Sequence, residues 1–270
     1  MTTVRAVLFD LGHTLVFQAH QPERQHLYTR IAEQVQPLLR NWATRPNIEA
    51  AALIRDLYQA IETAEPGRRE RGFEVDCPFI AQGALAAYGV DVSPEQAREF
   101  WRTCALDLSV WGWQLYPDTL DTLRRLRTLS MPAAIVSNSW SASDARATLL
   151  ASFGLSEELA GVFVSSADVG RPKPRPEPFL RALEQLGVTS ADAVFVGDDL
   201  DADVRGAKAL GITTVWKLNG RHEVPPAPEA DYAIHDLWEL FTLDLLPERS
   251  AAALPQQSLM PHEDDNAGRY

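Results

Sequence analysis

Short apolar runs alternate with helix-like segments along most of the chain. The first run spans residues 4–9, and later runs that we interpret as strands cover residues 133–136, 162–165, 193–196 and 213–216. Such nearly continuous runs are typical of strands that are buried on both faces. Helical periodicity predicts helices over 117–129, 141–153, 176–187, 202–210 and 236–246, and residues 232–234 would add an edge strand. This βαβ rhythm indicates an α/β fold, with a parallel sheet covered by helices on both faces.

The stretch from residue 17 to residue 113 has a different character. Its apolar residues recur at helical spacing without strand patterns, and Ser93-Pro94 begins one such helix with a capping serine and a first-turn proline. Gly67 and Gly72 flank an arginine-rich segment, residues 68–71, that we interpret as a solvated loop. We therefore predict an inserted helical domain at 17–113, with residues 1–16 and 114–248 forming the α/β core. Residues 249–270 lose apolar periodicity and are predicted to be a flexible tail.

Composition and charge narrow the classes of function. The formal net charge of the 270 residues is −12, which argues against nucleic acid as the main partner because phosphate backbones need a basic surface. An apolar run of about 18 residues, as a membrane-spanning helix requires, is absent, and the N-terminus does not look like a signal peptide. The two cysteines, Cys77 and Cys104, fit reduced, packed thiols. We expect a cytoplasmic protein with no membrane partner; its oligomeric state is left open.

Polar clusters lie at the ends of two predicted strands. Asp10 ends the first, followed by Gly12, and a carboxylate placed there can act as a covalent nucleophile. Ser137 and Asn138 follow the second and could hydrogen-bond an oxyanion, although a helix cap before Ser141 is the simpler interpretation. Ligands of open parallel sheets bind at this edge, so these groups should converge.

Two further clusters add charge of opposite sign. Lys173 lies between two prolines that restrict its loop, so its ammonium could be aimed at an anion, although a lone loop lysine is usually solvated. After Gly197, residues 198–203 carry four aspartates in six positions. Acids packed this closely at a buried strand end repel one another unless a cation compensates them, and Mg²⁺ prefers such ligands. The alternative is an acidic helix N-terminus.

In this order and spacing, the four clusters resemble the motifs of the haloacid dehalogenase-like hydrolase superfamily. The resemblance covers roughly residues 4–240 and implies a Rossmann-like three-layer α/β core, with the 17–113 insertion as a helical cap. It also implies a phosphatase that acts on a small phosphorylated metabolite. Asp10 would attack phosphorus and form an aspartyl-phosphate.

The resemblance also implies roles for the remaining residues of these clusters. Asp10, the Gly12 carbonyl and Asp198 would ligate Mg²⁺, and Asp199 or Asp203 would orient metal-bound water. Ser137 and Lys173, with Asn138 beside them, would hold the transferring group.

One position departs from the family pattern. Phosphatases of the family usually have a second aspartate two residues after the nucleophile, as general acid and base, and here that residue is Gly12. Such help is typically worth about 10²–10⁴-fold in rate. His13 is adjacent; we interpret it first as a turn residue and second as a substitute acid. A 2-haloacid dehalogenase, whose leaving halide needs no proton, and a non-catalytic binding protein are the alternatives.

Aromatic residues are frequent in and beside the predicted insertion. They could line a cleft, but we expect most of them to pack the helical bundle, because aromatic side chains dominate protein cores. They are Trp42, Phe73, Phe79, Trp101, Trp111 and Trp113.

Overall fold

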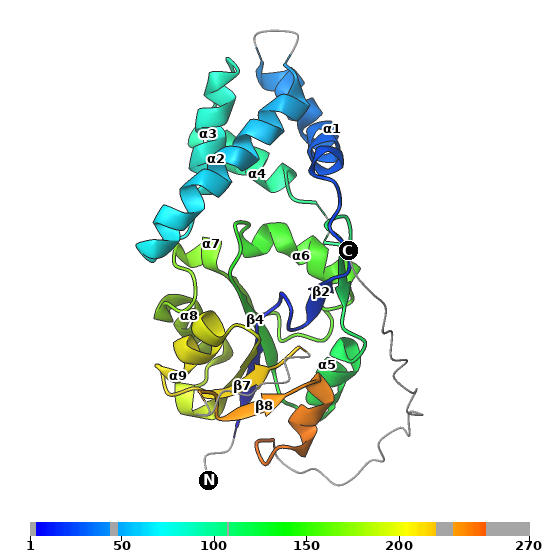
Figure 1. The fold of residues 1–270 in the computed structure, drawn as a ribbon, viewed down its shortest axis with the longest axis vertical. Coiled ribbons are helices and arrows are strands. Elements are labelled where there is room, and N and C mark those ends of the chain that lie inside the picture. The colour runs from blue at the N-terminus through cyan, green and yellow to red at the C-terminus, as the bar shows by residue number, and fades with distance from the viewer. Residues whose placement is uncertain (1–3, 44–47, 107, 220–228, 247–270) are drawn as a thin grey trace, which may run out of the picture.

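A six-stranded, fully parallel sheet forms the centre of the α/β part in a computed structural model that describes residues 4–43, 48–106, 108–219 and 229–246. Its strand order is β5-β4-β1-β6-β7-β8. The strands are β1 (Ala6–Phe9), β4 (Ala133–Ser137), β5 (Phe163–Ser165), β6 (Ala193–Gly197), β7 (Thr213–Lys217) and β8 (Tyr232–Ile234). The predicted α/β fold with a parallel sheet is confirmed, including the edge strand (Figure 1).

Alternating side chains of the central strands enter two separate cores. Val7 and Phe9 of β1 face a core that contains Leu123 of α5 (Thr119–Thr128) and Leu150 of α6 (Ser143–Ser152). Leu8 faces the opposite core, built with α8 (Pro176–Leu186) and α9 (Gly206–Lys208). Successive residues of a strand point to opposite faces, so a strand buried on both sides must be apolar throughout. The result is three layers.

Four helices pack above the sheet's carboxyl edge, around a core of their own (Figure 1). They are α1 (Arg24–Trp42), α2 (Ala50–Glu70), α3 (Cys77–Ala87) and α4 (Pro94–Thr103). We call them the helical layer. Helix α4 begins as predicted, with Ser93 and Gln96 forming a capping box and proline at the first turn. Cys77 and Cys104 are buried in this layer as free thiols.

A two-stranded antiparallel ribbon joins the helical layer to the sheet. It pairs β2 (Val16–Gln18) with β3 (Trp113–Leu115). The prediction that residues 17–113 contain no strand was therefore wrong. Each strand of the ribbon has only three residues, which is too short for an alternation of apolar and polar positions to be recognised. The division of the chain into two domains near these residues stays a prediction.

Three helices differ from their sequence-based predictions. The arginine-rich residues 68–71 form the last turn of α2 and its cap rather than a loop. An interior glycine costs a helix only about 1 kcal/mol, so Gly67 is tolerated, whereas Gly72 has φ +71° and ends the helix.

The two other differences lie in the α/β part. The predicted helix 236–246 is a 3₁₀ helix, η3 (Leu237–Thr242), whose buried Leu237 and Leu240 have the three-residue repeat of that form. The first half of the helix predicted at 202–210 is a π-helical turn, η2 (Leu200–Arg205).

Two short elements complete the fold: α7 (Ser166–Val169) and a 3₁₀ turn, η1 (Ser190–Asp192). Neither was predicted from the sequence. The tail predicted at 249–270 lies outside the described residues. Among the helices that are described, none combines the length and apolar character needed to traverse a lipid bilayer.

Candidate active site

Residues from all four sequence clusters meet at one edge of the sheet. Asp10 follows β1, Ser137 ends β4 and Asp198 follows β6, and these three strands are neighbours in the order β4-β1-β6. Because the strands are parallel, their carboxyl ends lie side by side. The backbone N–H of Asp10 continues the ladder by donating to the Val196 carbonyl (2.9 Å). Lys173 reaches the same point from the loop before α8.

The ammonium of Lys173 bridges two carboxylates. Its Nζ lies 2.7 Å from Asp10 Oδ1 and 2.6 Å from Asp203 Oδ1. Lys173 is only 4% exposed, Asp10 9% and Asp203 1%, so the three charges are withdrawn from water. Buried ions are tolerated when they are paired and hydrogen-bonded, which both bonds provide. The loop lysine predicted from sequence is therefore a member of the site.

Burial and pairing oppose each other in the pKa values of this group. Loss of hydration raises the pKa of Asp10, and Lys173 counteracts that effect. The same cause raises the pKa of Asp203 to about 6, again opposed by Lys173 and reinforced by Asp10. Burial alone would lower the pKa of Lys173, but the two carboxylates outweigh it and raise the value. Lys173 is therefore a fixed positive charge beside Asp10.

Asp203 is held from its other side by the backbone. Its Oδ2 accepts hydrogen bonds from the N–H groups of Asp198 (3.1 Å) and Asp199 (3.0 Å). Gly197 makes this approach possible, because a Cβ there would collide with the Asp203 carboxylate. The Asp199 carboxylate instead caps η2, accepting from the N–H groups of residues 201 and 202. The sequence predicted both aspartates as metal-site residues; in the structure Asp203 lies against Lys173, and Asp199 is an exposed cap.

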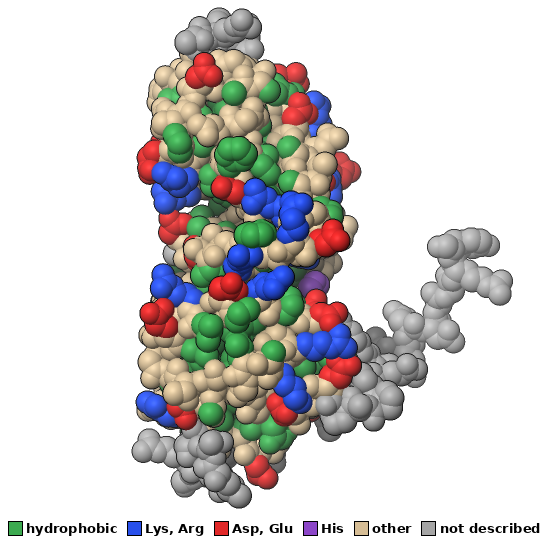
Figure 2. Space-filling view, turned by 90° about the vertical axis from the view of Figure 1, so that its left-hand side faces the viewer, with side chains coloured by type: hydrophobic (Ala, Val, Ile, Leu, Met, Phe, Trp, Pro, Cys, Tyr) green, Lys and Arg blue, Asp and Glu red, His purple; other side chains and the backbone are tan. Residues whose placement is uncertain are grey.

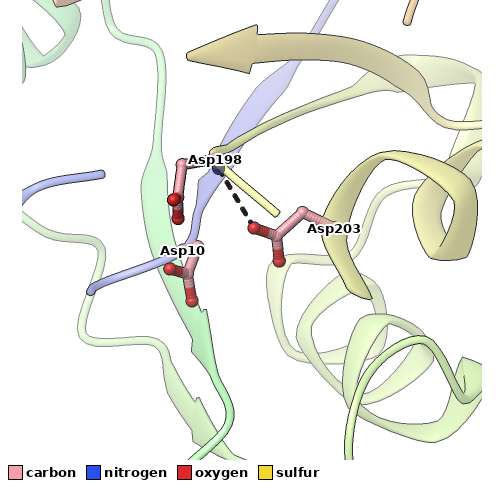
Figure 3. A group of neighbouring side chains, drawn as sticks. All are labelled: Asp10, Asp198 and Asp203. Carbon is pink, nitrogen blue, oxygen red and sulfur yellow. Dashed lines mark hydrogen bonds between the residues drawn. The ribbon is translucent and has the colours of Figure 1, made fainter. Parts of the chain in front are cut away.

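Three carboxylates converge closely enough to share one cation. Asp10, Asp198 and Asp203 each place an oxygen within 4.8 Å of the others, and Figure 3 shows Asp10 and Asp198 at adjacent strand ends with Asp203 on the turn beside them. If all three are ionised, Lys173 neutralises only one of their charges. Hard oxygen ligands and the remaining negative charge fit a divalent ion such as Mg²⁺. The donor set therefore fits the predicted metal.

The Asn138 side chain forms two hydrogen bonds with the backbone of Lys173. Its Nδ2 donates to the Lys173 carbonyl oxygen (3.0 Å) and its Oδ1 accepts from the Lys173 N–H (2.7 Å). The amide side chain thus fixes the loop that carries the ammonium. The Ser137 hydroxyl lines the same space and makes a long, 3.5 Å contact with the Asn138 carbonyl oxygen, which leaves it available to a ligand. Neither residue caps α6, whose N-cap is Ala142.

The loop after the nucleophile is shaped by Gly12 and His13. A Cβ added to Gly12 would lie 3.6 and 3.9 Å from two ring carbons of Trp113. His13 has φ +57°, is exposed, and its ring lies 5.2 Å from that of Trp113. The His13 carbonyl accepts a 2.7 Å hydrogen bond from Asn219. His13 therefore forms the turn expected of it, and it also lines the cavity.

A cavity of about 690 Å³ opens above these residues, between the sheet edge and the helical layer. Trp101, Trp111 and Trp113, which the sequence offered as cleft-lining or bundle-packing residues, line this cavity, and Trp101 and Trp111 also pack in the core of the helical layer. Tyr58 and Trp140 line it as well and were not singled out from the sequence. Arg69, from the segment predicted to be a solvated loop, also lines it. Helical positions that face a core and those that face a cavity have the same spacing, so the pattern of α2 and α4 does not distinguish them.

The segment that follows α2 contacts the α/β part directly. The Glu74 N–H donates to the Gly170 carbonyl (3.0 Å), and the Glu74 carboxylate accepts a short hydrogen bond from the Ser166 hydroxyl. Burial raises the pKa of Glu74, partly offset by that hydroxyl. The Arg171 guanidinium stacks 3.8 Å from the Phe73 ring centroid. Basic and acidic side chains gather across the middle of one face, between the two parts (Figure 2).

Comparisons with known proteins agree with this geometry. Residues 4–211 match the family model described as haloacid dehalogenase-like hydrolase. The chain is 31% identical over 249 residues to a phosphoserine phosphatase from Thermus thermophilus, covering 90% of this chain and 92% of that protein. It is 33% identical over 220 residues to a glyceraldehyde 3-phosphate phosphatase from Methanopyrus kandleri, covering 82% and 86%.

Solved structures share the fold. A phosphatase from Thermococcus onnurineus has a TM-score of 0.51 at 27% identity, covering 88% of this chain and 97% of that one. A 2-haloacid dehalogenase from Pseudomonas syringae pv. Tomato DC3000 has a TM-score of 0.60 at 21% identity, covering 89% and 97%. The second likeness shows the fold alone.

Proposed function

This chain belongs to the haloacid dehalogenase-like hydrolase family, and from that premise we propose that it is a Mg²⁺-dependent phosphatase of a small phosphorylated molecule. The observation that carries the proposal is the Lys173 ammonium between Asp10 and Asp203, beside the Asp198 carboxylate. In this arrangement the Lys173 ammonium opposes the rise that burial causes in the pKa of the Asp10 nucleophile, and it provides positive charge where phosphate oxygens would lie.

The first chemical step would be attack by an Asp10 oxygen on phosphorus. The phosphorus–oxygen bond to the leaving group breaks, that oxygen departs with the electron pair, and an aspartyl-phosphate remains. Lys173 and the Ser137 hydroxyl hold the phosphoryl oxygens. In the second step water attacks phosphorus, its proton passes to solvent, and inorganic phosphate leaves the restored Asp10 carboxylate. Gly12 donates no proton to the leaving group, so a leaving group of low basicity is favoured.

Asp10, Asp198 and the Gly12 carbonyl would hold the metal, and Asp203 supports the set through Lys173 and the backbone of Asp198. A bound Mg²⁺ would draw off charge from the transferring phosphoryl group. Asp10 then serves both as ligand and as nucleophile.

Hydrolysis of 4-nitrophenyl phosphate with Mg²⁺ and with EDTA tests the proposal, alongside Asp10→Asn. We expect activity with Mg²⁺ only, and its loss in the variant. The exposed Asp91→Asn is the matched control and should retain activity. Acid quenching followed by borohydride reduction should convert an acyl phosphate at Asp10 to homoserine, which peptide mass spectrometry detects. Metal-independent turnover, or turnover by Asp10→Asn, would refute the mechanism. The absence of any turnover, together with failure to bind Mg²⁺, would favour a non-catalytic binding protein.

A 2-haloacid dehalogenase is the second candidate, and the missing acid favours it. Halide departs without a proton, and Gly12 supplies none. In that reaction an Asp10 oxygen displaces halide from carbon, and water hydrolyses the resulting ester. Chloride release from 2-chloropropionate in EDTA, with no phosphate release in Mg²⁺, would establish this reading. We place it second because Asp10, Asp198 and Asp203 form a group that fits a metal.

A further inference from the structure

We propose that the cavity takes phosphate esters with an aromatic leaving group, so that the departing oxygen is weakly basic and needs no proton donor. The proposal rests on the phosphatase function above and names its substrate class. Two features of the cavity carry it: the aromatic ring that lies against Gly12 and the aromatic wall that continues from it.

The first feature concerns the position where the family's acid would stand. Two carbons in the six-membered ring of Trp113 lie 3.6 and 3.9 Å from the place of a Cβ on Gly12. A Cβ alone would be in ordinary contact, but the carboxyl group of a longer side chain would have to share space with the indole. The side of the cavity next to the nucleophile therefore offers an aromatic surface in place of a carboxyl group. Trp113 belongs to β3, so the ribbon holds it there.

The second feature is that other rings continue this surface. Tyr58, Trp101, Trp111 and Trp140 line the same cavity from α2, α4 and the two loops that face them. The Tyr58 ring centroid lies 5.9 Å from that of Trp101 and 6.1 Å from that of Trp111, so their surfaces adjoin. The Trp101 indole N–H is satisfied by the Trp140 carbonyl oxygen (3.1 Å), which leaves the ring apolar toward a ligand. Planar rings gain by stacking against such surfaces.

The volume and the far wall agree with a large substrate. At about 690 Å³ the cavity lies in the range of sites for drug-sized ligands, roughly 300–1,000 Å³, and a three-carbon phosphate would leave most of it empty. Arg69 and Glu65 line it as well, paired at 3.3 Å. This ion pair adds polar groups beside the aromatic residues and suits a polar substituent on the ring.

An aromatic leaving group also suits a site that has no acid at Gly12. A phenol has a pKa of about 10, whereas an aliphatic alcohol, like water, is far less acidic. A phenolate therefore leaves without the general-acid help that an alkoxide needs, help typically worth about 10²–10⁴-fold. A site that has Gly12 for the acid and Trp113 against it loses little with an aromatic ester and much with an aliphatic one.

Steady-state kinetics with Mg²⁺ test the proposal on three esters: 2-naphthyl, phenyl and cyclohexyl phosphate. The first two leaving groups have similar acidity and differ by one ring, whereas the last two are similar in size and differ in basicity. We expect kcat/KM to be roughly tenfold higher for naphthyl than for phenyl, as aromatic stacking supplies. We expect phenyl to exceed cyclohexyl by at least about 10²-fold.

Variants distinguish stacking on the aromatic wall from the effect of leaving-group basicity. Trp111→Leu should lower kcat/KM for 2-naphthyl phosphate roughly tenfold, to near the phenyl value, and change phenyl phosphate far less. The matched control is Trp238→Leu, because Trp238 lines a second cavity beside Tyr116 and Lys217. This variant should preserve the ratio of kcat/KM for the naphthyl and phenyl esters. Calorimetry with 2-naphthylphosphonate and phenylphosphonate gives the same comparison without turnover.

The outcomes separate this inference from the proposed function. Hydrolysis of cyclohexyl phosphate as fast as of the aryl esters, or no naphthyl preference in either turnover or binding, overturns the substrate class and leaves the phosphatase standing. The absence of hydrolysis of all three esters with Mg²⁺ overturns both.

Discussion

Two buried lysines, in two regions of the molecule, differ in what burial does to them. Lys173 lies at the candidate active site and is 4% exposed; Lys217 ends β7 beside a second cavity and is 2% exposed. The pKa of Lys173 is raised, whereas that of Lys217 is lowered to about 8. Burial is the same, so the difference comes from the partners. A carboxylate in contact raises the pKa of a buried ammonium, whereas a neutral partner leaves the loss of hydration free to lower it.

Among the residues that the structure describes, those around Lys217 are polar, and none places a carboxylate in contact with its ammonium. Its Nζ donates to Asn219 Oδ1 (2.6 Å) and lies 3.3 Å from the Tyr116 ring centroid. Loss of hydration lowers its pKa, and the charges of Asp118, Asp198 and Asp236 oppose this only in part. Asp118 also accepts a hydrogen bond from the Leu237 N–H (2.6 Å). The ammonium of Lys217 is therefore a poorly compensated charge, and that of Lys173 a well-compensated one.

Removing the well-compensated charge should have the largest effect. Lys173→Met leaves Asp10 and Asp203 buried side by side without their cation. Breaking a buried pair costs about 3–5 kcal/mol, so the free energy of unfolding in EDTA should fall by that amount. The kcat/KM for 4-nitrophenyl phosphate should fall by roughly 10²–10³-fold, as when a donor to a developing charge is removed. Urea denaturation and steady-state kinetics measure the two effects.

The chain offers a matched control in its third lysine. Lys208 is exposed and pairs with Asp231 at 3.0 Å, and such surface pairs are worth about 0–1 kcal/mol. Lys208→Met should therefore change stability by less than about 1 kcal/mol. Equal losses in the two variants would show that pairing with Asp10 and Asp203 is not what stabilises Lys173.

Lys217, the poorly compensated lysine, should make the free energy of unfolding depend on pH. In EDTA, raising the pH from 7 to 10 should stabilise the wild type relative to Lys217→Met by about 2–3 kcal/mol. The sign follows from the lowered pKa: between about 8 and 10.5 the unfolded chain keeps a proton that the folded chain has lost, so folding becomes more favourable as pH rises. Below about 8 both states are protonated and the destabilisation is complete.

Urea denaturation of both proteins across this pH range measures the effect. Between pH 6 and 7 the difference between them should stay constant, which serves as the internal control. A difference that is also constant up to pH 10 would mean that Lys217 keeps an ordinary proton affinity despite its burial.

The surroundings of Lys173 could be predicted from the sequence better than those of Lys217, for physical reasons. The ends of β1, β4 and β6 could be located because strands buried on both faces are continuously apolar, and Asp10, Ser137 and Asp198 follow from that. Lys173 could be assigned only with the resemblance, since nothing local marks a loop lysine as buried. Lys217 escaped notice, because the predicted strand ended at Trp216 and the Tyr116 ring beside its ammonium comes from a distant part of the chain.

The remaining part of the site depends on packing between distant segments. The ribbon of β2 and β3 was too short to show alternation, so the sequence could not place Trp113 against Gly12. Tyr58 and Trp140 reach the cavity from segments 82 residues apart in sequence, and only the docking of the helical layer brings them to one wall. Chemistry set by strand ends is thus predictable, and specificity set by inter-layer packing is not.

The smallest effect concerns the backbone of each lysine rather than its charge. Lys217 is part of the β7–β8 ladder, where it pairs with Ile234, whereas the Lys173 backbone is held in its loop by the Asn138 amide. Asn138→Ala leaves two backbone groups without these partners and should lower the free energy of unfolding by about 1–2 kcal/mol.

Catalysis should distinguish positioning by Asn138 from a purely structural role. The ammonium of Lys173 remains present in Asn138→Ala but is less well placed, and a misplacement of about 1 Å can cost on the order of 10²-fold. We expect kcat for 4-nitrophenyl phosphate to fall roughly 10- to 100-fold with a smaller change in KM, whereas the exposed Asn41→Ala changes neither. A loss of stability with unchanged kcat would mean that the β4 loop needs Asn138 to fold but that Lys173 finds its position without it.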